Sequence, residues 1–540
     1  MRILKAGFAA LAVFAFTQTQ AQVKGATFSV GNKFTEKKSE ITDAELKRWS
    51  FLDLQKDTIP GMSVDKAYNE FLKGRKGSKV VVAVVDSGVD IDHEDLKSVI
   101  WTNPNEIPNN GKDDDKNGYI DDIHGWNFLG DAVNENYEFI RVLKKGDDGS
   151  ETYKKAKMEL ASKRAEMLQN KQQLDFVLNA KKAIDAKLGK TTYTVDEIKA
   201  IDPGTDANLS QAKFIMMSVI MQAGPKFMDE IGEFEKQIKD QFDYALNMDF
   251  DGRKIVGDNP DDIKDTKYGN NNVTGPIKDE AFHGTLVSGI IASERGNGKG
   301  TDGIADNVQI MAVRAVPNGD EYDKDIALAI RYAVDNGAKV INGSFGKYFS
   351  PHKEWVADAI KYAASKDVLV VFASGNDGKD LDIQENRSYP TDAPDPAKGE
   401  VADNVLTVGA LNYVYGKQLV ANFSNYGKTY VDVYAPGVQV YGVKPGDKYT
   451  SSDGTSFASP NAAGVAALVR SYFPNLTAAQ VKHILMDSGT ALSDEVVLGE
   501  KAEKRPFSEA SKSGHLVNAY NALVMAEKMS KSMPAKKVKG

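Results

Sequence analysis

Four polar residues in this 540-residue sequence stand at predicted strand ends or helix starts, where catalytic chemistry is feasible. Ser456 lies in GTSFASP, directly before the small-residue helical run NAAGVAALVRSYF. A serine on a tight turn at a helix start can project its hydroxyl toward free backbone N–H groups that would stabilise an oxyanion. Asp86 follows the apolar run VVAVV, His283 opens HGTLVSGIIA, and Asn376 follows VVFASG. A serine nucleophile needs a histidine base, a carboxylate that orients the base, and an oxyanion donor.

Each of these residues also has a simpler structural interpretation. Ser456 could cap a helix, and Pro460 would be tolerated in a first helical turn. Asp86 could be a turn or cap residue, His283 a cap or core histidine, and Asn376 ordinary turn chemistry before Asp and Gly. Together, however, they come from distant parts of the chain, as catalytic triads do. The order Asp, His, Ser is one in which that geometry occurs.

The elements that must position these residues are short apolar strands alternating with helical segments. Strands are predicted at 79–88, 310–316, 338–346, 368–377 and 405–411, and helices at 283–294, 324–337 and 353–367. The strands are β-branched and apolar on both faces, which is typical of a parallel sheet buried on both sides. The alternation predicts an α/β fold with a doubly wound, mainly parallel sheet and helices on both faces. Such folds place their chemistry at the carboxyl ends of the strands.

The motifs around the four residues together resemble the subtilisin-like serine proteases, the subtilases of the S8 peptidase family. They are DSGVDIDHEDL at Asp86, HGTLVSGIIAS at His283, SGND at Asn376 and GTSFASP at Ser456. The resemblance implies a serine endopeptidase that works through an acyl-enzyme intermediate. Ser456 would be the nucleophile and His283 the general base, with Asp86 orienting the imidazole. Asn376 and the Ser456 backbone N–H would form the oxyanion hole.

The resemblance covers roughly 59–130 and 275–525, and its last part includes SGHLVNAYNAL, which looks like the family's closing strand and helix. It also implies a substrate-binding segment. The residues that would pair with the substrate backbone and line the primary pocket are Ser344, Phe345, Gly346 and Gly375.

Three residues depart from the family pattern. Lys347 follows the substrate-binding segment where a small residue is usual, and Asn461 and Leu286 take positions where histidine is common. None of the three is a member of the triad. They put the shape of the subsites in doubt, and leave the expected activity as it stands.

A large insertion separates Asp86 from His283, with about 200 residues between them. The expected boundaries are a peptidase domain over 59–130 and 279–528 and a helical insertion over 131–278. Charged helical runs and a capping box from Thr194 to Glu197 predict two or three long helices packed as a hairpin or small bundle. The insertion is either a solvated decoration or a lid or wall beside the cleft. A catalytically idle scaffold that binds partners through this insertion is the alternative to a protease.

An acidic loop, NNGKDDDKNGYIDD, is the candidate metal site. Alternating oxygen ligands around a bend glycine resemble the first part of an EF-hand loop, and calcium loops of larger subtilases are similar. The glutamate that would close an EF-hand is missing. The expected calcium ligands are Asp113, Asp115, Asn117, the Tyr119 carbonyl and Asp122, with Asp121 as an alternative to Asp122. The simpler interpretation is an acidic turn with scattered charges.

Composition and the chain ends set further limits. The chain is 41% hydrophobic and 27% charged, which is ordinary for a globular protein, and its net charge of −8 gives no electrostatic case for a nucleic-acid partner. We therefore expect a protein or peptide substrate and leave the oligomeric state open. Residues 1–21 have the layout of a secretory signal, followed by a short polar segment at 22–58. These features predict export to a periplasmic or extracellular location, and leave open whether the protein stays in the periplasm, binds the cell surface or enters the medium. No later apolar run is long enough to span a membrane. Cysteine is absent from the sequence, and residues 529–540 are predicted to be a solvated C-terminal tail.

Overall fold

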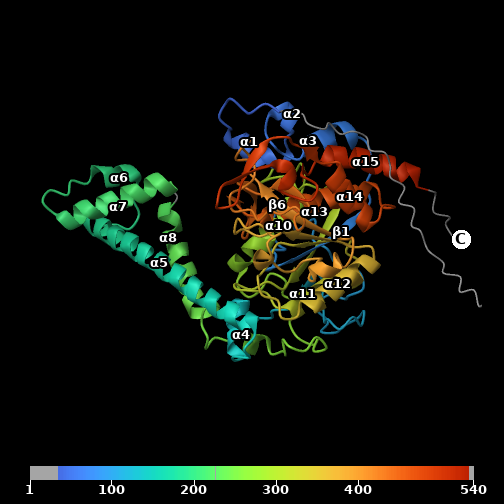
Figure 1. The fold of residues 1–540 in the computed structure, drawn as a ribbon, viewed down its shortest axis with the longest axis horizontal. Helices are drawn as coiled ribbons and strands as arrows, with labels where there is room; N and C mark the ends of the chain where they lie inside the picture. The colour runs from blue at the N-terminus through green and yellow to red at the C-terminus, as the bar shows by residue number, and fades with distance from the viewer. Residues whose placement is uncertain (1–33, 225–226, 534–540) are drawn as a thin grey trace, which may run out of the picture.

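A nine-stranded sheet forms the centre of the computed structural model, which describes residues 34–224 and 227–533 (Figure 1). Within these residues the strand order is β10-β13-β7-β6-β5-β4-β1-β3-β2, and all neighbours are parallel except β10 and β13. The strands are β1 (Val80–Asp86), β2 (Gly125–Asn127), β3 (Val308–Arg314), β4 (Val340–Gly343), β5 (Leu369–Ala373), β6 (Val405–Leu411), β7 (Val433–Pro436), β10 (Thr490–Ala491) and β13 (His515–Leu516). Two hairpins lie outside the sheet, β8 (Val440–Lys444) with β9 (Lys448–Ser452) and β11 (Glu495–Leu498) with β12 (Glu503–Pro506).

Helices cover both faces of the sheet, as the α/β prediction requires (Figure 1). One face carries α11 (Asp323–Asp335) and α12 (Lys353–Ser365). The other face carries α10 (Phe282–Ala292), α13 (Thr455–Tyr472), α14 (Ala478–Asp487) and α15 (Ala519–Ser532). Successive residues of a strand point to opposite faces. Val82 and Val84 accordingly join the core on the α13 side, whereas Ala83 and Val85 join the core on the α11 side.

The N-terminal segment packs on the main core, which its polar sequence did not reveal. It forms α1 (Asp43–Arg48) and α2 (Leu54–Asp57), and α3 (Val64–Lys66) follows it. Trp49 is 1% exposed, and its indole N–H donates to the Val438 carbonyl at 2.9 Å. The segment therefore contributes large side chains to the same core as α10 and α13.

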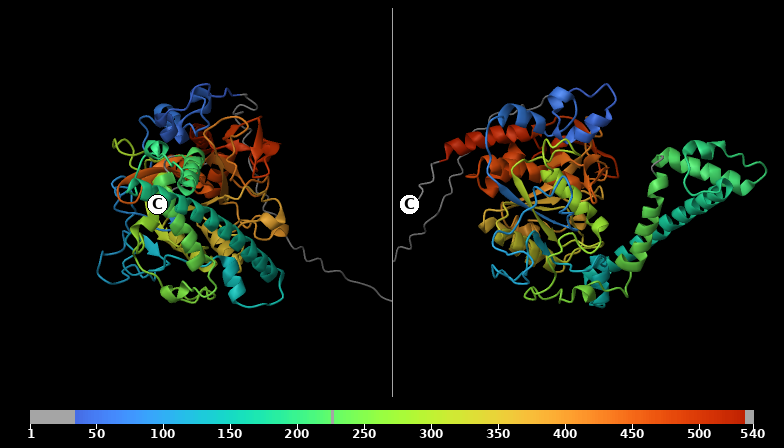
Figure 2. Two further views of the ribbon diagram at one scale, coloured as in Figure 1. Left: turned by 90° about the vertical axis from the view of Figure 1, so that its left-hand side faces the viewer. Right: turned by 180° about the vertical axis from the view of Figure 1, so that it is seen from behind.

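The inserted helices form an arm that stands away from the sheet (Figures 1 and 2). They are α4 (Glu138–Lys144), α5 (Glu151–Leu188), α6 (Val195–Ala200), α7 (Ala207–Ala223), α8 (Phe227–Asp240) and α9 (Arg253–Val256). The Ser150 side chain caps the start of α5, and Gly189 ends it with a φ of 68°. The capping box at Thr194 and Glu197 is present at α6. Ile184, Ile198 and Met216 form a small core at the distal end of the arm.

No helix in the described part of the chain has both the length and the apolar character to cross a bilayer. The expected leader at 1–21 and the final residues of the tail lie outside the described residues. Their assignment stays a prediction.

Candidate active site

Asp86 and His283 lie in direct contact at the carboxyl end of β1. Asp86 is the last residue of β1, and His283 is the second residue of α10. Their side chains meet at 2.7 Å between Oδ1 and Nδ1. Gly284 permits this approach, because a Cβ at that position would lie 2.2 Å from the Gly88 carbonyl oxygen. The sequence motifs thus bring together two residues that are 197 positions apart.

The contact with Asp86 controls the protonation of His283. Burial of the imidazole opposes its positive charge, but the charge of Asp86 and its hydrogen bond outweigh this effect and raise the His283 pKa above its ordinary value of 6.5. The backbone N–H of Ser87 donates to the same carboxylate oxygen at 2.7 Å, which fixes the orientation of Asp86. A bond to Nδ1 leaves Nε2 of the ring for proton transfer.

Ser456 is the second residue of α13, so its backbone N–H is one of the first helical donors, which have no acceptor within the helix. Its hydroxyl donates to the Ser344 carbonyl at 3.3 Å, and not to His283 among the described hydrogen bonds. The neighbouring Phe457 ring lies 5.6 Å from the His283 ring, centroid to centroid. Hydrogen bonds between catalytic groups are often long or unformed without substrate.

Pro460 lies in the sixth position of α13, beyond the first turn in which the sequence placed it. Proline has no N–H, so it cannot donate to the carbonyl of Ser456 four residues earlier. The Ser344 hydroxyl donates to that carbonyl instead, at 2.7 Å. Ser344 also bonds to Ser459 and Asn342. The proline thus frees a carbonyl that ties the start of α13 to the predicted substrate-binding segment.

The Asn376 side chain follows β5 and is anchored by Thr455. The backbone N–H and the hydroxyl of Thr455 both donate to Asn376 Oδ1, each at 2.8 Å. The Thr455 hydroxyl in turn accepts from the Gly375 N–H at 3.1 Å. Because its oxygen is held in this way, the Asn376 NH₂ group is directed away from these donors. Its orientation is set before any substrate binds.

The predicted substrate-binding residues line the strand end beside Ser456. The Phe345 ring packs edge-on to Phe372, with centroids 6.0 Å apart. A Cβ at Gly346 would lie 3.3 Å from the Tyr389 carbonyl oxygen. Gly375 has a φ of 100°, where a side chain would be strained and would meet the Asn425 amide at 2.5 Å. Small residues therefore keep the backbone on both sides of this segment accessible.

Residues 77–507 match the family model described as the subtilase family. The chain belongs to the subtilase family. It is 41% identical over 230 residues to a thermophilic serine proteinase of Bacillus sp. (strain AK1), covering 42% of this chain and 50% of that protein. It is 35% identical over 219 residues to subtilisin DY of Bacillus licheniformis, covering 40% of this chain and 74% of that protein.

The subtilase chain therefore spans half the length of the first of these relatives. A third relative, a cell wall-associated protease of Bacillus subtilis (strain 168), is 37% identical over 226 residues, which cover 42% of this chain and 23% of that protein. Among solved structures, a protease of Pseudoalteromonas arctica aligns with a TM-score of 0.37 and 27% identity, covering 45% of this chain and 70% of that one.

Lys347, which departs from the subtilase pattern, is buried against the base of the arm. Its ammonium bonds to Glu138 of α4 at 2.7 Å, to Asp323 at 3.0 Å and to the Glu321 carbonyl at 2.6 Å. Burial opposes the Lys347 charge, but these acids raise its pKa above the ordinary value. Burial raises the pKa of the neighbouring Glu321 carboxyl to about 8. Removing one partner from a buried pair typically costs about 3–5 kcal/mol, so this ion pair fixes α4 next to the substrate-binding segment.

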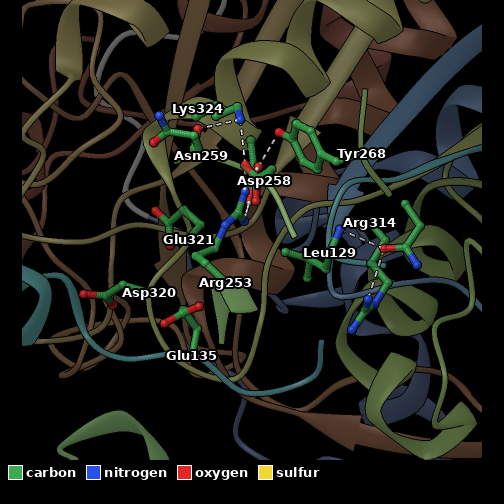
Figure 3. A network of polar contacts seen from close by, with 12 residues as sticks. Leu129, Glu135, Arg253, Asp258, Asn259, Tyr268, Arg314, Asp320, Glu321 and Lys324 are labelled. Atoms are coloured by element: carbon green, nitrogen blue, oxygen red, sulfur yellow. Dashed lines mark hydrogen bonds and ion pairs between the residues drawn. The ribbon is translucent and has the colours of Figure 1, made fainter. Parts of the chain in front are cut away.

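A second buried network holds the returning end of the insertion on α11 (Figure 3). Arg253 pairs with Asp325 at 2.6 Å and with Asp258. Lys324 Nζ donates to Asp258 at 2.6 Å, and the Tyr268 hydroxyl donates to Asp325 at 2.6 Å. The two ends of the insertion are thus both anchored to the peptidase core, although the distal part of the arm with α6 and α7 stands clear of it (Figure 1). The sequence motifs indicated none of these partners, because the pairs that join the insertion to α11 are 66 and 72 residues apart in the chain.

The acidic loop gathers its carboxylates, and it recruits one that the sequence did not predict. Ligand oxygens of Glu106, Asp113 and Asp115 lie within 4.8 Å of one another. Glu106 is 7% exposed, and its Oε2 is buried with no hydrogen-bond partner among the described residues. Its Oε1 accepts the N–H groups of Asp114 and Asp115. An unpaired carboxylate oxygen facing two further carboxylates fits a hard cation such as calcium.

Of the remaining predicted metal ligands, Asn117 is hydrogen-bonded to this cluster, whereas Asp122 is not among its three carboxylates. The Asn117 amide donates to Asp115 at 3.2 Å and to Asp122 at 3.1 Å. Asp122 also accepts from the Tyr332 hydroxyl at 2.5 Å, and burial raises its pKa to about 6. The Tyr119 ring packs edge-on to Tyr332, with centroids 4.9 Å apart. The Asp122 carboxylate therefore already accepts hydrogen bonds from Asn117 and Tyr332, whereas Glu106 Oε2 has no hydrogen-bond partner among the described residues.

Proposed function

We propose that this subtilase is an exported serine endopeptidase that hydrolyses peptide bonds in protein or peptide substrates. The observation that carries the proposal is the 2.7 Å contact between Asp86 and His283 beside the start of α13, where Ser456 lies. The names of its relatives, which include serine proteinases and a subtilisin, support it. Asp86 would hold the imidazole in the tautomer whose Nε2 accepts a proton.

The proposed reaction proceeds in two half-reactions. Ser456 Oγ attacks the substrate carbonyl carbon while His283 Nε2 takes its proton, and the carbonyl oxygen becomes an oxyanion. The Asn376 NH₂ group and the Ser456 N–H donate to that oxyanion. The C–N bond then breaks as His283 returns the proton to the leaving amine, which gives an acyl-enzyme. Water attacks the ester by the same route and restores the Ser456 hydroxyl.

We propose a structural calcium site in the loop of residues 106–122. Glu106, Asp113 and Asp115 would supply charged ligands, with Asn117, the Tyr119 carbonyl and Asp122 as the further ligands that the sequence predicts. Calcium would relieve the repulsion among these carboxylates and stabilise a fold that has no disulfides.

We propose that the arm is a wall beside the catalytic cleft. In support, Lys236 of α8 pairs at 2.9 Å with Glu280, three residues before His283. Glu159 of α5 also lines a hollow together with Tyr348, whose hydroxyl donates to Asp377, the residue directly after Asn376. A wall at this place would exclude bulky folded proteins and admit extended chains.

Export rests on the leader-like sequence of residues 1–21 together with the cell wall-associated protease among the relatives. The test of the proposed function is hydrolysis of a chromogenic tetrapeptide by the secreted protein and by its Ser456→Ala variant. Turnover by wild type, lost in a folded Ser456→Ala variant, is the expected result. Equal turnover by both proteins would refute the role of Ser456, and no turnover by either would favour a catalytically idle scaffold.

A further inference from the structure

The arm contains a pocket that the proposed reaction does not use. It lies between α5, α8 and the helical turn Gln241–Ala245, and its volume is about 570 Å³. Sites for small molecules and peptide side chains typically measure about 300–1,000 Å³. Its lining combines apolar side chains with uncharged amides, among them Met167, Leu174, Ile238, Asn170, Gln173 and Gln237.

The chemistry of this lining matches an unfolded polypeptide. Each amide side chain offers both a donor and an acceptor, which is what an unpaired peptide backbone needs, and the apolar residues suit one buried side chain. Gln241 Oε1 also lines the pocket region, buried and without a hydrogen-bond partner among the described residues. Lys163 is the cation of the lining, and it is paired with Glu166 at 2.9 Å. The pocket thus suits a neutral polypeptide better than an anion.

Helix α5 connects this pocket with the candidate catalytic cleft. Glu159, Lys163, Met167, Asn170 and Leu174 recur at spacings of three and four residues, so they lie on one face of the helix. The upper part of this face lines the pocket. Glu159, near the beginning of α5, lines a neighbouring hollow of about 1320 Å³ that Tyr348, two residues after the substrate-binding segment, also lines.

One wall of this hollow reaches the region of the oxyanion donor. Tyr348 lines the hollow together with Glu159 of α5, and its hydroxyl donates to Asp377. Asp377 directly follows Asn376 in the sequence. A chain that leaves the cleft on this side would therefore meet the beginning of α5.

The other wall of the pocket approaches His283. Lys236 of α8 bonds to Asp240 at 3.0 Å and to Glu280 at 2.9 Å, and Glu280 lies in the short helix Lys278–Ala281 that leads directly into α10. Two helices that line the pocket therefore both reach the region of the candidate active site, α5 beside Tyr348 and α8 through Glu280. Because the helices that line the arm pocket also reach the candidate active site, one polypeptide ligand could occupy both the pocket and the active site.

We propose that the arm pocket is a second binding site for the polypeptide substrate, which captures an apolar segment of an unfolded chain at a distance from the scissile bond. The proposal rests on the proposed protease function. It implies that long unfolded chains bind more tightly than short peptides, because one molecule occupies both sites. Short peptides reach only the catalytic cleft.

The test fills the pocket and uses a matched control on the same helix. Gln172 and Gln173 are both exposed residues of α5, but Gln173 lines the pocket and Gln172 does not. In Gln173→Trp, the KM for β-casein should rise about tenfold, while kcat/KM for a chromogenic tetrapeptide stays within about twofold of wild type. In Gln172→Trp, both values should stay at the wild-type level.

The tetrapeptide measurement separates this inference from the proposed function and shows that each variant is folded. Tetrapeptide cleavage with an unchanged casein KM in Gln173→Trp would overturn the second site and leave the protease function intact. Absence of tetrapeptide cleavage in wild type would overturn the protease function itself. If wild type sediments as a dimer and Gln173→Trp as a monomer, the occupant is a second copy of the chain, and the substrate proposal is wrong.

Discussion

Replacing Asn376 with alanine tests the oxyanion hole at its most defined contact. In the structure, two hydrogen bonds of 2.8 Å from Thr455 fix the amide oxygen, so the NH₂ group is oriented before substrate arrives. A preorganised donor requires no rearrangement during the reaction. Asn376→Ala should therefore lower kcat by about 10²–10³-fold, the range found for loss of such a side-chain donor in a related subtilisin. KM should change little, because the bond forms mainly in the transition state.

A variant of the anchor measures how much of this effect comes from orientation. Thr455→Val removes the hydroxyl bond to Asn376 and keeps the backbone bond. One neutral hydrogen bond contributes about 1 kcal/mol, which corresponds to a decrease in kcat of about fivefold. Thr455→Ser retains the hydroxyl and is the matched control. Thr455→Val should also melt at a lower temperature, because it leaves the Gly375 N–H unpaired.

The assay is steady-state hydrolysis of a chromogenic tetrapeptide, with enzyme concentrations set by active-site titration. A kcat for Asn376→Ala within about threefold of wild type would refute the assignment of Asn376 as an oxyanion donor. If Thr455→Ser lost as much activity as Thr455→Val, the argument from the hydroxyl anchor would be wrong.

Three further predictions concern pH, metal and the arm. Activity needs neutral His283. Burial opposes the charge of this imidazole, but Asp86 raises its pKa, so the acid limb of the kcat/KM profile should lie above pH 6.5. In Asp86→Asn the limb should move to lower pH and kcat should fall about 10⁴-fold, and an unmoved limb would contradict this. Chelation should lower the melting temperature and added calcium should restore it, whereas the double variant Asp113→Ala, Asp115→Ala should show no change in melting temperature with calcium. Metal-stripped protein that melts identically with and without calcium would exclude a stabilising site. Replacing residues 171–236 with a short Gly-rich linker should increase cleavage of folded proteins and leave tetrapeptide hydrolysis unchanged, and equal effects on both substrates would argue against a wall.

The sheet could be predicted from the sequence because its strands are buried on both faces. The predicted strand at 405–411 coincides with β6, since this apolar run is flanked by polar residues that end it. The prediction for 79–88 extended past the end of β1 at Asp86, where the chain turns into the candidate site. Continuous β-branched runs of this kind are specific to parallel sheets, so the fold class followed directly.

The missed features depend on contacts between residues that have no recognisable motif. Trp49 lies in a segment that is polar on average, although Trp49, Phe51 and Leu54 anchor it in the core. Glu106 precedes the acidic loop, and only folding brings it to Asp113 and Asp115. An unusual lysine at 347 was visible in the sequence, but its partner Glu138 lies 209 residues away. A lysine at a position where the family has a small residue is a signal that acidic partners lie nearby, and it could have prompted a search for them.

Covalent labelling of Ser456 tests the central claim most directly. The purified protein is treated with a fluorophosphonate, and the modified residue is identified by peptide mass mapping. The account predicts one adduct, on Ser456, which is slowed in Asp86→Asn and absent from a folded Ser456→Ala variant. An unlabelled wild-type protein, or an adduct that persists in Ser456→Ala, would contradict it.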